Sequence, residues 1–382
     1  MPARSRGRAC STAAPATSSA GAAAMDGSTP PAAARRRSAR RRNRSQCTSG
    51  SLSPCIPTRL RTRRRHRDRR GVRRRLARAR GCATVPFRRE IMRLAHVSDL
   101  HLLDLEGVSW KRFLNRRILG GVNLLLRRAK EYRPEVVEVM VDDLIKEEVD
   151  HVAVSGDLTN LALEGEFDRV FHLFKLVGGR DKVSVVPGNH DYYTFAAADN
   201  RKFEKYFYPF FDVGFTDLDV DIYPYQKRIG DLLIVGVNSA TRTLPPMSYG
   251  TVGDRQLDLL DKVLGSAQAR SCFTCLLMHH ALHRRDRLTE TMSGLLNRDK
   301  VLALVDKHRV DLVLYGHDHR GRIWKREQEG HTTYLVCCGS SSRVVPDPAR
   351  VARYRIIHIE DGRIRRIDTK VYDPVARRFM LE

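Results

Sequence analysis

The sequence has no run of about 18 consecutive apolar residues, the length that a transmembrane helix needs. Residues 1–91 also lack the continuous apolar core of a secretory signal. Cysteine is sparse after that point, with four in the remaining 291 residues, all in apolar stretches, which excludes a disulfide framework. Cys272 and Cys275 would face opposite sides of a strand, which argues against a redox pair. We therefore predict a cytoplasmic protein with reduced thiols.

Lysine is absent from residues 1–91, which hold 25 arginines and only three acidic residues. The rest of the chain is almost neutral, with 44 basic and 41 acidic residues. A segment rich in Arg, Ala, Ser and Pro buries too little apolar surface to offset its ordering entropy. The sequence therefore predicts a disordered leader over 1–91 and one globular domain over 92–382.

Three interpretations of this leader remain open. Its arginine runs are typical of segments that bind nucleic-acid phosphates, which would make the protein a non-catalytic nucleic-acid binder. An Arg-rich, Ser-rich and acid-poor leader is also typical of organellar transit peptides. The third interpretation is a mis-assigned start, because Met92 opens the sequence MRLAHVSDLHLL and a predicted strand begins there at once.

Apolar runs alternate with helical patterns along most of the domain. Buried strands are predicted at 93–98, 151–156, 182–188, 227–237, 272–278 and 310–316. Helices are predicted at 110–133, 135–148, 164–177, 254–264 and 295–307. The end of the chain, from 322 to 372, instead has the pattern of antiparallel strands and hairpins. This order predicts stacked layers of sheets and helices.

Five polar clusters directly follow predicted strands. They are Asp99-Leu100-His101, Gly156-Asp157, Gly188-Asn189-His190-Asp191, His279-His280 and Gly316-His317-Asp318-His319. Sites in open α/β sheets lie at the carboxyl ends of strands. Carboxylate, imidazole and amide side chains without thiolates suit two divalent ions better than a structural zinc site. In an extended segment the two outer side chains of Asp-x-His or His-x-His would point the same way.

This ordered series of motifs resembles the calcineurin-like metallophosphoesterase superfamily over residues 92–345. The resemblance implies an α/β fold, a four-layer αββα sandwich of two facing mixed β-sheets flanked by helices. It implies that the ligands of the first metal are Asp99, His101 and His319. It implies that the ligands of the second metal are Asn189, His279 and His317. Asp157 would bridge the two ions.

The resemblance also places two catalytic side chains beside the metals. His190 would contact a phosphate oxygen or protonate the leaving group, and Asp191 would orient it. Asn160 stands where many members have Asp in the second motif, which weakens any supporting role of that side chain. Of the pair His279 and His280, the first usually aligns with the family's ligand.

These features predict a dinuclear metal-dependent phosphoric ester hydrolase in which a metal-activated water attacks the phosphorus atom. The cofactors implied are two divalent or trivalent ions, Mn²⁺, Fe²⁺/Fe³⁺ or Zn²⁺. The SDLHL and GDLT motifs look most similar to the bacterial class III cyclic-nucleotide phosphodiesterase branch. The leading substrate is therefore a 3′,5′-cyclic nucleotide, and the partner is a small phosphoester.

Residues 104–133 motivate an alternative substrate. This segment carries eight basic and three acidic residues, with apolar residues between them. One interpretation is a lid that meets an anionic membrane surface transiently, which would suit a lipid-linked pyrophosphate or head-group phosphohydrolase. The other is a helix that packs its apolar side on the domain and exposes its basic side. The domain itself shows no feature that predicts nucleic-acid binding.

Overall fold

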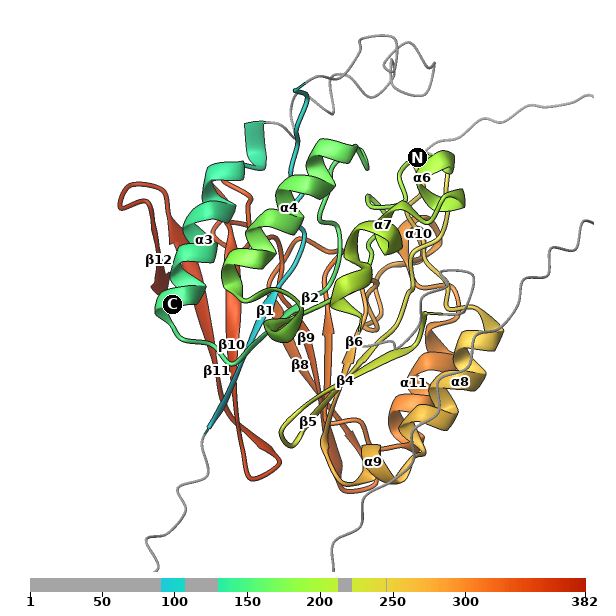
Figure 1. The fold of residues 1–382 in the computed structure, drawn as a ribbon. Helices are drawn as coiled ribbons and strands as arrows, with labels where there is room; N and C mark the ends of the chain where they lie inside the picture. The colour runs from blue at the N-terminus through green and yellow to red at the C-terminus, as the bar shows by residue number, and fades with distance from the viewer. Residues whose placement is uncertain (1–90, 107–129, 212–221, 245) are drawn as a thin grey trace, which may run out of the picture. The chain divides into compact units, whose positions relative to one another are not determined.

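Two six-stranded β-sheets form the framework of the domain (Figure 1). The computed structural model describes residues 91–106, 130–211 and 222–382, except residue 245. The predicted leader, apart from residue 91, and positions 107–129 of the basic segment lie outside these residues. The boundary predicted at residue 92 therefore stays a prediction. None of the described helices has the length and apolar character needed to span a bilayer.

The first sheet carries the start and the end of the domain. Its strands, in spatial order, are β12 (Arg378–Leu381), β11 (Arg363–Asp373), β10 (Arg353–Glu360), β1 (Met92–Val97), β2 (His151–Val154) and β3 (Val183–Val185). Strands β1, β2 and β3 are parallel, whereas β10, β11 and β12 pair antiparallel. The sheet is therefore mixed, and its parallel half supplies strand ends that lie together.

The second sheet is mixed in the same way. Its strands, in spatial order, are β4 (Tyr225–Ile229), β5 (Leu232–Gly236), β6 (Phe273–Leu277), β7 (Leu312–Tyr315), β9 (His331–Cys337) and β8 (Arg322–Gln328). The four central strands are parallel, and β4 and β8 pair antiparallel at the two edges.

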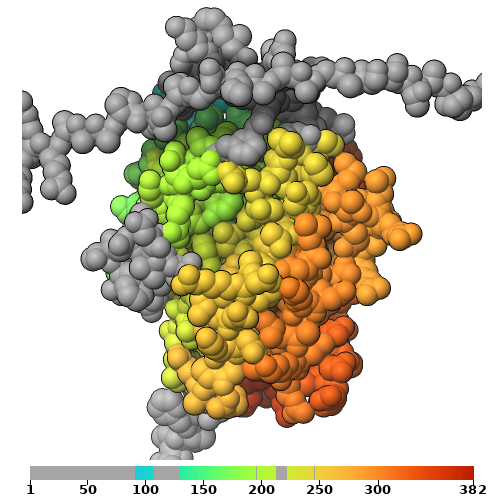
Figure 2. Space-filling view, turned by 90° about the vertical axis from the view of Figure 1, so that its right-hand side faces the viewer, coloured from blue at the N-terminus to red at the C-terminus, as the bar shows by residue number. Residues whose placement is uncertain are grey.

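Helices cover the outer side of each sheet (Figure 1). On the first sheet these are α3 (Pro134–Lys146) and α4 (Glu164–Val177), and on the second α8 (Asp254–Leu264) and α11 (Arg298–Lys307). Figure 2 shows the outer face of the second layer, where the gold atoms of α8 lie beside the orange atoms of α11. Shorter helices are α5 (Gly179–Lys182), α6 (Phe195–Asp199), α7 (Lys202–Phe207), the 3-10 helix η2 (Tyr208–Phe210), α9 (Ala267–Arg270) and α10 (Arg287–Ser293). The predicted four-layer αββα arrangement is confirmed.

Alternation along the strands of the second sheet separates two cores. Ile234 on β5 and Cys275 on β6 join the core between the sheets, whereas Leu233 and Leu276 join the core beneath α8 and α11. Cys272 packs against the outer core, so it and Cys275 face opposite ways as predicted. All four described cysteines are free thiols.

Several sequence predictions were wrong in detail. The strand predicted over 227–237 is a hairpin of β4 and β5 that turns at Gly230, whose φ is 56°. The helix predicted from residue 295 begins at Arg298. The preceding Asn297 is tied to Val252 instead: its Oδ1 accepts from the backbone N–H of Val252, and its Nδ2 donates to the backbone oxygen of Val252. Strand β12 was not predicted. The phenylalanines of α7 and η2, Phe203, Phe207 and Phe210, are buried in the core between sheet and helices.

A buried glutamate makes the stability of the domain depend on pH. Glu166 of α4 is 0% exposed, and its Oε2 accepts hydrogen bonds from the backbone of Leu161 at 2.9 Å and Leu163 at 3.0 Å. Burial raises the pKa of Glu166 to about 8. The native state therefore holds this proton more tightly than the unfolded chain, in which a Glu titrates near pH 4.3. The stability that this proton contributes is complete below about pH 4.3 and is lost as the pH rises towards 8.

We expect Glu166→Gln to remove this dependence, because Gln accepts the same two bonds without ionising. The free energy of unfolding of the unmodified chain should fall by roughly 2–4 kcal/mol more than that of Glu166→Gln between pH 5 and 9. Urea unfolding at both pH values measures the difference. Glu138→Gln, at an exposed position of α3, is the control, and its free energy of unfolding should fall with pH as much as that of the unmodified chain. Parallel pH profiles for Glu166→Gln and the unmodified chain would contradict the assignment.

Candidate metal centre

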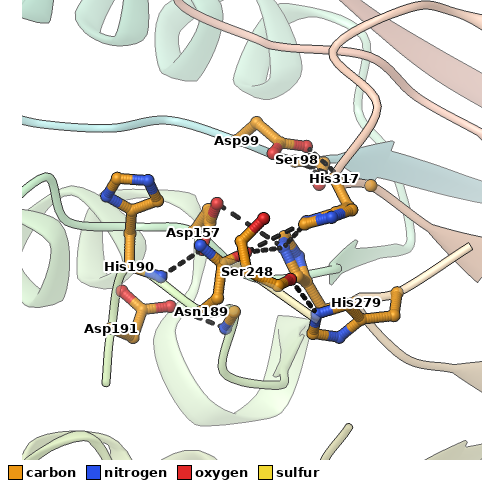
Figure 3. Close-up of polar contacts among 12 residues, drawn as sticks. Ser98, Asp99, Asp157, Asn189, His190, Asp191, Ser248, His279 and His317 are labelled. Carbon is orange, nitrogen blue, oxygen red and sulfur yellow. Dashed lines mark hydrogen bonds and ion pairs between the residues drawn. The ribbon is translucent and has the colours of Figure 1, made fainter. Parts of the chain in front are cut away.

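Five loops bring the predicted site residues together at one edge of the sandwich (Figure 3). Asp99, Asp157 and Asn189 follow β1, β2 and β3 of the first sheet. His279 and His317 follow β6 and β7 of the second sheet. Because these five strands are parallel within their sheets, their carboxyl ends converge. The structure thus assembles all five motifs that the sequence singled out.

The first group of donor atoms comprises Asp99, His101, Asp157 and His319, whose ligand atoms all lie within 4.8 Å of one another. His319 Nε2 lies 3.1 Å from Asp99 Oδ1 and 3.1 Å from His101 Nε2. His101 Nε2 lies 3.6 Å from Asp157 Oδ2. Such a set of two imidazoles and two carboxylates can hold a metal ion.

The second group meets the first at Asp157. His279 Nε2 lies 3.5 Å from Asp157 Oδ2 and 3.2 Å from Asn189 Oδ1. His317 Nδ1 lies 3.0 Å from Asn189 Oδ1 and 3.2 Å from His279 Nε2. Figure 3 shows His279 and His317 on one side of Asp157 and His190 on the other. One carboxylate oxygen therefore faces donor atoms of both groups.

Electrostatics favour positive charge at this point. Burial alone would raise the pKa of Asp157, but the neighbouring His279, His190 and His101 outweigh it and hold that pKa well below its usual value. Burial alone would lower the pKa of His279, but the charge of Asp157 outweighs it and raises that pKa to about 9. The ionised carboxylate thus attracts a cation, and the group fits a metal ion on this observation.

Hydrogen bonds outside the cluster fix which nitrogen of each imidazole points inward. His279 Nδ1 donates to the backbone oxygen of Ser155 at 2.7 Å, and His317 Nε2 donates to that of Ser293 at 2.8 Å. His319 Nδ1 pairs with the hydroxyl of Tyr132 at 2.7 Å. Each ring therefore points its other nitrogen into the cluster, where that nitrogen can bind a metal ion once it carries no proton. Sequence reasoning missed Tyr132 and Ser293, because no motif marks either residue.

Left-handed backbone conformations aim the candidate ligands. The φ angles are 51° at Asp99, 44° at His101, 52° at Asp157, 72° at His317 and 51° at His319. Such values cost non-glycine residues of order 1–3 kcal/mol each and are concentrated at functional sites. The extended backbone that we predicted for Asp-x-His and His-x-His is therefore wrong, although Asp99 and His101 do meet in the first group as predicted. His317 turns into the second group and His319 into the first, rather than both pointing the same way.

Two glycines of the motifs are required by close contact. A Cβ on Gly188 would lie 2.2 Å from Asp157 Oδ1. A Cβ on Gly316 would lie 2.0 Å from Ser98 Oγ and 2.4 Å from Asp99 Oδ2. Only glycine lets these loops approach the two carboxylates, which explains Gly in GNHD and GHxH physically.

His190 lies beside the cluster, but Asp191 does not orient it as predicted. The ring Nδ1 of His190 donates to the backbone oxygen of Asn160 at 2.9 Å, which sets the orientation of the ring. Asp191 is fully buried and instead accepts bonds from the backbone of Gly188, Leu158 and Thr159, so it joins the GD and GNHD loops. Because Asn160 acts through its main chain, its departure from the family's Asp does not affect this bond.

His280 is turned away from the donor atoms. Its Nδ1 pairs with Ser239 Oγ at 2.9 Å and its Nε2 with the backbone oxygen of Ser248 at 3.1 Å. Burial, and then the charge of His279, lowers the pKa of His280 to about 3, so it stays neutral. The geometry therefore places His279, and not His280, in the cluster.

A cleft of about 710 Å³ opens onto the cluster. Asp157, Asn189, His190, His317 and His319 form its floor. Tyr193 lines the cleft, is 37% exposed, and stacks on the ring of His190 at 5.5 Å between centroids. Ligand pockets in proteins are usually between about 300 and 1,000 Å³, so this cleft can take a nucleotide-sized molecule.

Comparison with known proteins gives both a family and remote structural likenesses. No curated protein sequence matches the chain. Similar solved structures include the purple acid phosphatase PPD1 from yellow lupin (Lupinus luteus) seeds, with 14% identity, a TM-score of 0.47, and coverage of 76% of this chain and 53% of that one. The chain thus spans about half the length of that phosphatase.

Two other similar structures come from smaller proteins. An uncharacterised protein from Streptococcus pneumoniae TIGR4, described as a predicted phosphoesterase, is 13% identical, with a TM-score of 0.33 and coverage of 76% and 94%. Vps29 from Entamoeba histolytica, complexed with Zn²⁺, is 15% identical, with a TM-score of 0.34 and coverage of 76% and 97%. The model of the calcineurin-like phosphoesterase family matches residues 92–321, more than half of the chain, and this range contains all five motifs. The chain therefore belongs to the calcineurin-like phosphoesterase family.

Proposed function

We propose that this protein is a dinuclear metal-dependent phosphoesterase that hydrolyses a phosphodiester with a metal-activated water. The observation that carries the proposal is the position of Asp157 Oδ2, 3.6 Å from His101 Nε2 and 3.5 Å from His279 Nε2. A carboxylate between two imidazole-rich groups suits a bridge between two ions. The proposed ligands of the first ion are Asp99, His101, Asp157 and His319. The proposed ligands of the second are Asp157, Asn189, His279 and His317.

The donor set contains nitrogen and oxygen atoms and no thiolate, which suits Mn²⁺, iron or Zn²⁺. When bound, such a pair of ions neutralises phosphate charge, clamps the attacking and leaving oxygens, and supplies hydroxide at neutral pH. The chain itself orients the three rings through Ser155, Ser293 and Tyr132. The backbone oxygens of Ser155 and Ser293 also fix the tautomers of His279 and His317, because these oxygens only accept. The site is therefore preorganised before a substrate arrives.

His190 is the proposed acid or phosphate contact. Its Nδ1–H is held by Asn160, so Nε2 can carry a proton towards a leaving oxygen or a hydrogen bond towards a phosphate oxygen. Histidine is the side chain that most often transfers protons in enzymes at neutral pH. Its backbone N–H donates to Asp157 Oδ1 at 2.7 Å, which ties the loop of His190 to the bridging carboxylate.

Both substrate classes expected from the sequence remain candidates for this site. A 3′,5′-cyclic nucleotide would place its base near Tyr193 at the cleft. A lipid-linked pyrophosphate would extend past the cluster along the same cleft. We also place the protein in the cytoplasm, a proposal that the free thiols of Cys275, Cys337 and Cys338 support.

Hydrolysis of bis-p-nitrophenyl phosphate beside p-nitrophenyl phosphate tests the reaction. The full chain is stripped of metal and reloaded with Mn²⁺, and 3′,5′-cyclic AMP is assayed in parallel. The proposal predicts Mn²⁺-dependent cleavage of the diester. Cleavage of the monoester alone would mean a phosphatase, and a chain that binds no metal would contradict the proposal.

An arginine outside the motifs supports the second proposed ion position. Arg285 NH1 lies 2.7 Å from Asp318 Oδ1, between the two histidines of the GHxH motif. Its NH2 donates to the backbone oxygen of Ser293, which is also the acceptor of His317 Nε2. His283 Nε2 holds the other oxygen of Asp318 at 2.9 Å. Arg285 therefore braces the loop that turns His317 Nδ1 inward.

We expect Arg285→Ala to weaken binding of the second metal ion by about 10- to 100-fold, the usual effect of removing an outer support. Equilibrium dialysis against Mn²⁺ should show one tight and one weakened position, instead of two tight ones. Arg326→Ala, which removes a half-buried pair with Asp306 elsewhere in this layer, is the matched control and should keep both. If Arg285→Ala binds Mn²⁺ as tightly at both positions as Arg326→Ala does, Arg285 does not support the second ion position.

A further inference from the structure

The wall of the catalytic cleft carries more positive charge than its own contacts use. Five arginines line it beyond the candidate metal cluster: Arg284, Arg285, Arg320, Arg322 and Arg350. The acidic residues in the lining are Asp157, Asp286 and Asp318. Asp157 belongs to the cluster, and Asp286 caps α10 by accepting a hydrogen bond from the backbone of Thr289 at 2.9 Å.

The remaining acid is saturated by its neighbours. Asp318 accepts from Arg285 at 2.7 Å and from His283 at 2.9 Å, so it cannot neutralise another arginine without losing one of them. Arg320 and Arg350 share a single carboxylate, that of Asp347, at 3.4 and 3.5 Å. Two guanidinium groups on one carboxylate leave one positive charge unbalanced.

Arg284 and Arg322 add two more positive charges, against which the lining sets only the carboxylate of Asp286. Both are exposed, and neither forms an ion pair with any residue that the structure describes. The guanidinium of Arg322 lies over the ring of Trp324, 5.7 Å from its centroid, and Trp324 stacks on His283 at 4.1 Å. This contact holds the guanidinium of Arg322 beside the cleft.

We propose that this arginine wall, formed by Arg284, Arg320, Arg322 and Arg350, binds a second phosphate group of the substrate. The inference rests on the proposed function, in which the cluster takes the phosphate that is cleaved. A diester with one phosphate is neutralised there and has no group for the arginines. Guanidinium groups match phosphate oxygens in bidentate geometry, and their charge survives at any physiological pH. Of the two candidate classes, the arginine wall therefore favours a doubly phosphorylated or pyrophosphate-linked molecule over a 3′,5′-cyclic mononucleotide.

Binding measurements test this subsite independently of turnover. The full chain, loaded with Mn²⁺ at fixed free Mn²⁺, is titrated calorimetrically with AMP, ADP and adenosine 3′,5′-bisphosphate. The last two place the second phosphate at different distances from the first. We expect at least one of them to bind 10-fold or more tightly than AMP. In the double variant Arg284→Ala/Arg322→Ala this gain should fall to less than 3-fold.

Exposed arginines without ion pairs can be removed without harm to the fold, and the melting temperature checks this. The matched control is Lys300→Ala/Lys307→Ala, which removes two exposed cations of α11 outside the cleft and should keep the gain. No gain with either ligand, or a gain that survives in the arginine variant, would overturn the subsite. A gain that depends on the arginines, in a chain that cleaves no phosphodiester, would uphold the subsite and refute the proposed reaction instead.

Discussion

Asp157→Asn should lower the hydrolysis of bis-p-nitrophenyl phosphate by at least about 10³-fold and reduce bound Mn²⁺ from two ions per chain to one or none. Asp157 is the residue whose carboxylate faces both donor groups, and the surrounding histidines keep it ionised. Asn keeps the size and one oxygen but removes the charge. Loss of about 4 kcal/mol of charge stabilisation at the reacting phosphate corresponds to roughly 10³ in rate.

A control variant separates this effect from the loss of a carboxylate charge elsewhere in the domain. Asp311 lies at the opposite end of β7 and accepts a hydrogen bond from the backbone of Thr274 at 2.7 Å. Asp311→Asn keeps that acceptor and should keep both metal ions and the activity. Metal analysis and initial rates are measured on the same samples. If Asp157→Asn still binds two ions and hydrolyses the diester at a near-normal rate, Asp157 does not bridge two metal ions.

His190→Ala should lower kcat by about 10²- to 10⁴-fold while both metal ions stay bound. The side chain lies beside the cluster, with its ring perpendicular to that of His101 at 4.7 Å between centroids, and it does not join the donor set of the first group. Alanine removes the ring and leaves the backbone N–H that donates to Asp157. The expected separation of rate from metal content distinguishes a catalytic residue from a ligand.

The choice of leaving group then tells which of two roles His190 has. If it protonates the leaving oxygen, the loss should be at least 10-fold greater for a dialkyl phosphodiester than for bis-p-nitrophenyl phosphate, because nitrophenolate departs without a proton. If it contacts a phosphate oxygen, both substrates should lose the same factor. His172→Ala, on the exposed side of α4, is the control. A His190→Ala chain with unchanged rates on both substrates would refute either role.

The sequence predicted which side chains lie together at the candidate site, for a clear physical reason. Each candidate ligand follows a buried strand, and apolar runs such as 151–154 and 312–315 are readable without a structure. Parallel strands bring their carboxyl ends to one edge of a sheet, so residues 99 and 157 had to meet in the first sheet, and 279 and 317 in the second. The facing of the two sheets, which joins these pairs, was implied by the family resemblance. The layers followed from the same alternation of strands and helices.

The means by which the site is held could not be predicted. Backbone oxygens orient the rings of three histidines, and they belong to Ser155, Ser293 and Asn160. Because every residue type has a backbone oxygen, the sequence does not mark these positions. The left-handed conformations at Asp99 and His101 depend on tertiary contacts that override the local preference for extended backbone. Arg285 reaches the site from a loop about 30 residues from the GHxH motif, and only the fold places it there.

The most direct test of the dinuclear centre is a titration of the metal-stripped full chain with Mn²⁺, in which bound Mn²⁺ and hydrolysis of bis-p-nitrophenyl phosphate are measured together. Our account predicts that activity stays low through the first equivalent, rises with the second, and reaches its plateau at two ions per chain. Full activity at one ion per chain, or activity that does not depend on Mn²⁺ or any other metal, would contradict it.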